Sequence, residues 1–299
     1  MLGYGIQLPI QAQSTHFVEP WEGSAGHTEL AAIARACDES GFDYVAVCDH
    51  VAIPRDKAAA MSTTWYDTIA TLGWLAGVTQ RTRLLSHVYV PAYRHPLATA
   101  KAFATIDALS GGRAILGVGA GHVEAEFERL GIPFADRGRL TDEAVDQIRA
   151  ALAEEWIDDF GQSPRPVQLG GVPIWIGGSS NAAIRRAAER GDGWLPQGTP
   201  KKEMPVAIER LQELRAKAGR AWKPFTIGAI APFLWIGEKS WDTGDQCLAG
   251  PPEKIASYLR QYADMGVHQV QVRFRSRSVG ELQDQIRSFG ADVRPLLEV

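Results

Sequence analysis

Strand-like and helical patterns alternate along the whole chain, and this alternation constrains the fold more than any other feature. Eight segments rich in β-branched and aromatic residues are predicted as strands, and apolar residues at helical spacing follow each of them. The predicted strands span residues 2–10, 42–48, 83–90, 113–118, 172–176, 193–196, 225–236 and 267–274. Strands that alternate with helices pair in parallel, so eight units in 299 residues predict an α/β fold, a closed (β/α)8 TIM barrel rather than an open sheet.

Amphipathic patterns between the strands predict helices at residues 27–40, 65–78, 95–110, 141–156, 181–190, 200–218, 252–265 and 280–289. Two connections are longer than ordinary loops, namely residues 50–64 after the second strand and residues 157–171 before the fifth. The strand–helix rhythm continues on both sides of each, so we interpret them as insertions in one domain spanning residues 1–299. The first insertion leaves the C-terminal end of a strand, where barrel enzymes hold their active sites, and we expect a lid or pocket wall there; a passive surface insertion is the alternative.

Composition and charge argue against several classes of protein. A hydrophobic content of 45% supports a full core, whereas a net charge of −4 and a pI near 6.0 give no basis for binding nucleic acid or an anionic membrane. The N-terminal residues lack the features of a signal peptide, and no apolar run approaches the ~20 residues that span a bilayer. Cys37, Cys48 and Cys247 form no CxxC pair, and no HxH or HExxH element is present, so we expect reduced thiols and no metal. These features predict a soluble, cytoplasmic protein.

Three alternating glycines, Gly117, Gly119 and Gly121, stand at the end of a strand-like run at residues 114–118. Residues two apart on a strand share a face, so these glycines would leave a floor without side chains. Glycine inside a strand often marks the close approach of a ligand or of another backbone. We interpret the floor as a place for a flat ring; a glycine-rich turn into a helix is the alternative.

Asp49 and His50 stand where the second predicted strand ends. Histidine exchanges a proton near neutral pH, and a neighbouring carboxylate can fix its tautomer or raise its pKa. A structural hydrogen-bonded pair would be the other interpretation. The position at the C-terminal end of a strand favours a catalytic role for both residues.

Two further histidines and one glycine-rich turn are candidate site features. His87 lies inside the apolar strand LLSHVYV, where it is either functional or a satisfied core residue, and His122 directly follows the glycine floor. The sequence GGSSN at residues 177–181 follows an apolar strand and opens a helix. Backbone N–H groups and hydroxyls at a helix N-terminus bind phosphate well, although a plain strand–turn–helix junction would look the same. The spacing matches neither GxGxxG nor a P-loop, so it predicts a phosphate without naming a nucleotide.

Aromatic side chains gather near the candidate loops, and we interpret Trp21, Trp65 and Trp235 as a pocket wall. Such a wall would favour an apolar or planar substrate.

Three stretches of sequence together resemble the luciferase-like monooxygenase superfamily, and within it the oxidoreductases that use the deazaflavin coenzyme F420. They are VAVCDHVAIP at residues 45–54, PAYRHPLATAKAFATIDALSGGRAILGVGAGHVEAEFERLGIPFADRG at residues 91–138, and WIGGSS with RGDGW within residues 175–194. The resemblance covers nearly the whole chain. It implies a (β/α)8 barrel with the cofactor ring over the barrel mouth and the cofactor phosphate near the fifth strand.

The resemblance also assigns roles to single residues. Asp49 and His50 match the family's Asp-His beside the deazaflavin ring, and His87–Val88 matches a non-prolyl cis peptide behind that ring. The remaining matches are the loop beside the cofactor's linker, at Gly119, Gly121 and His122, and the phosphate contact, at Gly177, Gly178 and Ser179. Relatives often carry a tryptophan or a glutamate at the position of His122, and this departure leaves the proton donor and the substrate class open.

The resemblance implies hydride transfer between F420 and a small-molecule organic substrate, with His50 as the leading acid or base. An FMN-dependent monooxygenase on the same barrel is one alternative, and a non-catalytic protein that binds F420 or a flavin is another. The presence of Asp49, His50 and His122 together favours an enzyme, because a mere binder needs no proton donor. We also expect a homodimer.

Overall fold

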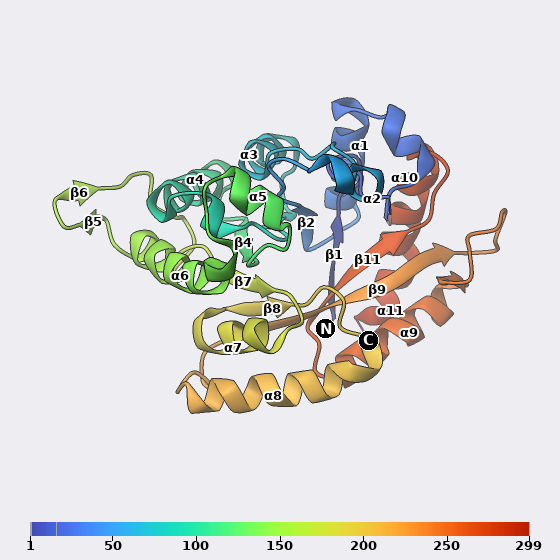
Figure 1. The fold of residues 1–299 in the computed structure, drawn as a ribbon. Helices are drawn as coiled ribbons and strands as arrows, with labels where there is room; N and C mark the ends of the chain where they lie inside the picture. Colours follow the sequence, from blue (N-terminus) through green and yellow to red (C-terminus); the bar gives the residue numbers. More distant parts are fainter. Residues whose placement is uncertain (1, 16, 299) are drawn as a thin grey trace.

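Eight parallel strands close into a barrel at the centre of the molecule, a computed structural model that describes residues 2–15 and 17–298 (Figure 1). The barrel strands are β1 (Gly3–Gln7), β2 (Tyr44–Val47), β3 (Arg83–Ser86), β4 (Ala114–Val118), β7 (Ile174–Gly177), β8 (Gly193–Leu195), β9 (Thr226–Ile236) and β11 (Gln269–Phe274). Strand β9 pairs with both β8 and β11, and this closes the ring. Each predicted strand overlaps one of these eight, so the predicted (β/α)8 barrel is confirmed.

Helices surround the barrel (Figure 1). The longer ones are α1 (His27–Glu39), α3 (Thr68–Val78), α4 (Pro96–Ser110), α6 (Arg137–Ala153), α7 (Asn181–Arg190), α8 (Met204–Lys217), α9 (Pro252–Asp264) and α10 (Val279–Ser288). The shorter ones are α2 (Ala58–Met61), α5 (Glu124–Arg129) and α11 (Arg294–Leu297), with single turns η1 (Pro20–Ser24), η2 (Arg55–Lys57), η3 (Pro91–Tyr93), η4 (Phe134–Asp136), η5 (Lys201–Glu203) and η6 (Phe289–Val293). Within the described part of the chain, no helix combines the length and the apolar character that crossing a membrane requires.

Polar side chains fix where several helices begin. The hydroxyl of Ser278 accepts the backbone N–H of Glu281 at 3.2 Å, and that of Ser180 accepts the N–H of Ala183 at the same distance. Each satisfies a backbone donor that has no partner within its own helix. Ser180 thereby fixes the start of α7, and this helix begins at the barrel mouth.

Besides the unpredicted short helices α2, α5 and α11, the structure differs from the prediction around α6 and after β9. The helix predicted at residues 141–156 runs instead from Arg137 to Ala153, and Trp156 opens an antiparallel hairpin of β5 (Trp156–Ile157) and β6 (Phe160–Gly161). This hairpin projects from the body of the molecule (Figure 1). A further strand, β10 (Cys247–Gly250), pairs in parallel with the outer part of β9 and was not predicted, because its sequence CLAG contains no β-branched or aromatic residue.

The insertion at residues 50–64 lies against the segment that follows β1. The N–H of Thr15 donates to the carbonyl of Ala60 at 3.0 Å, and the N–H of Gln13 donates to that of Thr64 at 3.1 Å. The two segments therefore brace each other along one side of the barrel mouth.

The inside of the barrel is apolar on one side and polar on another. Its apolar cluster consists of Tyr44, Ala46, Leu85, Ile115, Trp175 and Leu195. On β11, Val270, Val272 and Phe274 belong to the outer core between barrel and helices. Successive side chains of a strand point to opposite faces, so Gln269, Gln271 and Arg273 face the barrel interior.

Candidate active site

A cleft of about 920 Å³ lies at the C-terminal ends of the barrel strands. This is the face on which barrel enzymes carry their active sites. The segments after β2, β3, β4 and β7 all contribute to it. It brings together most of the residues selected from the sequence: Asp49, His50, Trp65, His87, Val88, Gly119, Gly121, His122, Gly177, Gly178 and Ser179.

His50 is held by a carboxylate that lies far away in sequence. Its Nδ1 atom is 2.7 Å from Oε2 of Glu126, a fully buried residue in the first turns of α5. The other oxygen of Glu126 accepts the backbone N–H groups of Val51 and Ala52 at 2.7 and 3.1 Å. Burial alone would raise the pKa of Glu126, but the hydrogen bonds from His50 and from these two N–H groups lower it. Glu126 is therefore an anion that accepts a hydrogen bond from the Nδ1–H group, and Nε2 of His50 has no hydrogen-bond partner among the described residues.

Asp49 does not contact the His50 ring, which corrects the expectation that it fixes the histidine's tautomer. Its buried carboxylate accepts two hydrogen bonds from the guanidinium of Arg94, at 2.7 and 2.9 Å. It also accepts the N–H of Val90 at 2.9 Å and the hydroxyl of Thr68 at 3.1 Å. With this many partners the carboxylate ties the ends of β2 and β3 together.

Two aromatic rings flank His50. The ring of Trp65 lies edge-on at 4.3 Å between centroids, and that of His122 lies edge-on at 5.5 Å. Partial burial of His122, followed by its proximity to His50, lowers the pKa of His122, so this ring is neutral near pH 7. Both candidate proton donors thus stand side by side, and only His50 has a carboxylate partner.

His87 is a buried neutral histidine. Burial lowers its pKa to about 4, and its Nε2 atom lies 3.3 Å from the carbonyl oxygen of Leu195. The peptide bond between His87 and Val88 is cis, as the resemblance implied.

The glycine floor is occupied by the chain itself, which corrects its interpretation as open space for a ring. A side-chain carbon on Gly117 would collide with the backbone oxygen of Ser86. One on Gly119 would lie 2.5 Å from a methyl carbon of Val88, and one on Gly177 would collide with the other methyl group. Gly121 lies beyond β4 at a positive φ of 76°. These glycines therefore admit the segment after β3 into the barrel mouth, where Val88 lines the cleft together with Gly119, Gly121 and Gly177.

The turn at residues 177–180 lies at the edge of the cleft and is held in a fixed conformation. Gly178 adopts φ of 89°, which a residue with a side chain rarely adopts, and Ser180 caps α7 at the edge of the cleft. The first N–H groups of α7 are therefore directed toward the cleft. The hydroxyl of Ser179 donates to the carbonyl of Gln197 at 2.8 Å and accepts from Thr199 at 2.7 Å, so it holds the turn in place.

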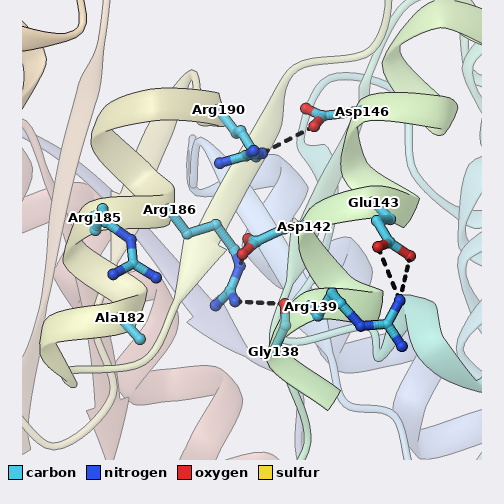
Figure 2. Close-up of a pocket in the computed structure, with 9 residues that line it drawn as sticks. All are labelled: Gly138, Arg139, Asp142, Glu143, Asp146, Ala182, Arg185, Arg186 and Arg190. Atoms are coloured by element: carbon cyan, nitrogen blue, oxygen red, sulfur yellow. Dashed lines mark hydrogen bonds and ion pairs between the residues drawn. The ribbon is translucent and has the colours of Figure 1, made fainter. Parts of the chain in front are cut away.

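An arginine-rich hollow of about 460 Å³ lies between α6 and α7 and shares Gly138, Ala182 and Arg186 with the cleft (Figure 2). Arg186 and Arg190 on α7 reach Asp142 and Asp146 on α6, at 2.5 and 3.1 Å. These ion pairs lock the two helices together, so the N-terminus of α7 is fixed relative to the cleft.

The three tryptophans predicted to form one pocket wall lie in three different places. Trp65 lines the cleft. Trp21 lines a neighbouring recess, where its indole N–H donates to Ser276 at 3.1 Å. Trp235 lines neither cavity, which corrects its assignment: it is 5% exposed, packs against Trp241 and donates to the carbonyl of Glu238 at 3.0 Å.

Glu126, Arg94 and Arg273 were not predicted from the sequence. Glu126 left a signal, since a carboxylate in the first turn of a helix directly after the glycine loop belongs to the same strand-end face. Arg273 left a clearer one, because residues 269–275 read QVQVRFR and alternate polar with apolar residues. A barrel strand is normally apolar on both faces, so the alternation itself marks a polar interior. Among the described residues, no group of three or more histidine, cysteine or acidic side chains could hold a metal.

Comparisons with known proteins identify the family. The model of the luciferase-like monooxygenase family matches residues 10–241. An uncharacterized protein of Mycobacterium tuberculosis is 29% identical over 70% of this chain and 79% of its own length. The 5,10-methylenetetrahydromethanopterin reductase of Archaeoglobus fulgidus is 33% identical over 68% of this chain and 59% of its own length. The solved structure of the coenzyme F420 dependent tetrahydromethanopterin reductase from Methanopyrus kandleri has the same fold, with a TM-score of 0.73 at 21% identity over 98% of this chain and 99% of that one. The family match covers most of the chain and agrees with the geometry of the cleft, and the chain therefore belongs to the luciferase-like monooxygenase family.

Proposed function

We propose that this protein is an oxidoreductase that transfers a hydride between coenzyme F420 and a small organic substrate. The observation that carries the proposal is the pairing of His50 with the buried Glu126 at the mouth of the cleft. A site that only holds a cofactor has no need of an oriented imidazole. The relatives named for F420 chemistry support the choice of cofactor.

The cleft has features that fit such a cofactor. The turn from Gly177 to Ser180 and the start of α7 would hold its phosphate, and Val88 would support its ring from behind. Bound there, the deazaflavin supplies the hydride or accepts it. The protein's own contribution is to orient the substrate, exclude water and move one proton.

His50 is the group we assign to that proton. Glu126 holds Nδ1 at 2.7 Å, so exchange with the substrate takes place at Nε2. Glu126 acts here as a positioning residue, because its buried carboxylate fixes the ring without reaching the substrate itself. His122, 5.5 Å away between ring centroids, is the alternative donor.

Cofactor binding is the first experiment. Fluorescence titration with F420 and with FMN should show clearly tighter binding of F420, and a Gly178→Val variant should bind F420 more weakly, because the φ of 89° is strained for any side chain. Equal or tighter binding of FMN would reject the F420 assignment and favour an FMN-dependent monooxygenase.

The second experiment tests which residue transfers the proton. His50→Ala should lower turnover by roughly 10²–10⁴-fold, the usual scale for general acid–base catalysis, while F420 affinity changes little. Turnover is followed as the loss or return of the oxidised coenzyme's absorbance, with His122→Ala as the matched variant. A loss in the His122 variant alone would transfer the role to His122. Full activity in both would mean that water or the substrate supplies the proton.

A further inference from the structure

Arg273 is a cation at the barrel mouth without an acidic partner. It is half-buried at the end of β11, and its guanidinium carbon lies 4.3 Å from the centre of the Phe17 ring. Within residues 2–15 and 17–298, no carboxylate or hydrogen-bond acceptor contacts its guanidinium, and burial lowers its pKa. The next two arginines of the chain differ: Arg275 pairs with Glu19 at 3.0 Å, and Arg277 pairs with Glu281 at 2.5 Å. A buried cation left without a partner is costly unless a ligand supplies one.

The position of Arg273 connects it to the cleft. It lines a recess of about 60 Å³ that shares Gln7, Ala12 and Phe17 with the cleft. The charge of Arg273 also acts on the buried His87 and on Cys48, both of which line the cleft. The recess is therefore a side pocket of the candidate active site.

The acidic groups of the recess are already engaged. Glu19 is paired with Arg275, and Glu22 accepts the backbone N–H groups of Ile10 and Glu19 at 2.8 and 2.9 Å. An anion that enters the recess therefore meets the unpaired charge of Arg273 rather than a free carboxylate.

We propose that Arg273 binds a carboxylate group of the substrate, so that the enzyme acts on small organic acids. A planar guanidinium binds a carboxylate through two parallel hydrogen bonds, and the guanidinium carbon of Arg273 lies over the Phe17 ring rather than against an acidic side chain. A recess of about 60 Å³ has room for about two water molecules, which suits a carboxylate better than a phosphorylated sugar. Phe17, Trp21 and Phe233 provide an apolar wall for the carbon skeleton. The assignment rests on the proposed function, because it names the substrate class of that same cleft.

The test measures binding of benzoate, phenylacetate and acetate to the protein by calorimetry, both with F420 added and without it. The neutral amides of the three acids and phenyl phosphate serve as comparison ligands. The acids should bind at least roughly tenfold more tightly than their amides, as expected for a charge-assisted hydrogen-bonded pair. Arg273→Gln should remove this preference, and Arg273→Lys should keep part of it. Arg287→Gln, an exposed arginine on α10, is the matched control and should keep all of it.

The outcomes separate this proposal from the proposed function. Normal F420 binding with no preference for acids over amides, or a preference that survives in Arg273→Gln, would overturn the carboxylate site and leave the F420 assignment intact. A preference that depends on Arg273 in a protein that does not bind F420 would support the carboxylate site and reject the cofactor. Tight binding of phenyl phosphate without binding of the acids would overturn the carboxylate assignment. Melting curves of both Arg273 variants confirm that they are folded.

Discussion

Two walls of the barrel interior differ in how their space and their polar groups are filled. The glycine wall, formed by Gly117 on β4, Gly119 directly after β4 and Gly177 on β7, has no spare volume, because Ser86 and Val88 fill the space that side chains would occupy. The polar wall, formed by Gln7 on β1 and by Gln271 and Arg273 on β11, carries polar groups that make few well-formed hydrogen bonds to the described residues.

The difference indicates which wall serves shape and which serves recognition. A close-packed wall provides a rigid surface, and the addition of a single carbon atom to it lowers the stability of the fold. A wall of unpaired polar groups gains little stability from them and is ready to bind a ligand that pairs them. Substitutions should therefore damage folding on the glycine wall and recognition on the polar wall.

The largest effect on stability is expected on the glycine wall. Gly117→Ala places a carbon against the backbone oxygen of Ser86, which cannot move without disturbing β3, so the free energy of unfolding should fall by about 3 kcal/mol or more. Gly73→Ala is the matched control: it lies inside α3 with no atom within 4 Å of the added carbon, and it should gain about 0.5–1 kcal/mol. Chemical denaturation measures both, and similar values for the two variants would contradict the packed wall.

A smaller effect is expected from His87, which lies between the two walls. Its folded-state pKa of about 4 is below the ordinary 6.5, so burial of the neutral ring contributes stability that is fully present above pH 6.5. That contribution is lost as the pH falls from 6.5 toward 4, because the unfolded chain takes up the proton first. The loss amounts to roughly 3 kcal/mol at most. Between pH 6.5 and 4, the free energy of unfolding should fall less steeply with decreasing pH for His87→Gln than for the wild type. Equal pH dependence in the two proteins would show that the ring protonates freely in the folded state.

The smallest effect is expected at Gln271 on the polar wall. It is fully buried, and its side chain makes no well-formed hydrogen bond to the described residues, although the His87 ring lies close enough to interact with it. Gln271→Leu should therefore change the free energy of unfolding by no more than about 1 kcal/mol. The matched variant is Gln285→Leu, which loses hydrogen bonds to both the N–H and the carbonyl of Ile236, at 2.7 and 3.2 Å, and should cost about 1–3 kcal/mol. Equal costs would mean that buried water pairs the amide of Gln271.

The repeating pattern of the chain predicted the barrel, because each strand and helix carries its own local signal. The predicted helix at residues 181–190 matches α7, since Ser180 caps its start and Gly191 follows its last residue. The helix predicted up to Trp156 shows the limit: its apolar spacing persisted beyond Ala153, but the chain turned into a hairpin. The spacing of apolar residues indicates which side chains share one face of a helix. It does not indicate the residue at which the helix ends and a hairpin begins.

The candidate site was predictable where neighbours in sequence are also neighbours in space. The ends of β2, β3, β4 and β7 supplied Asp49, His50, His87 and Gly177 from local patterns alone. The partners of these residues were not predictable in the same way. Glu126 lies 76 residues from His50, and Arg94 lies 45 residues from Asp49. Contacts of this kind depend on how the loops above the barrel fold against each other, which no local pattern encodes.

The filling of the glycine wall by Val88 has an evolutionary consequence. Positions 88, 119 and 177 share one volume, since both methyl groups of Val88 occupy the space beside the two glycines. None of the three can accept a larger side chain unless another becomes smaller, so their tolerated substitutions are linked and their effects on stability are not additive. A lineage that enlarges one of these residues must therefore acquire a compensating replacement at another. We expect substitutions at positions 88, 119 and 177 to be correlated among related sequences.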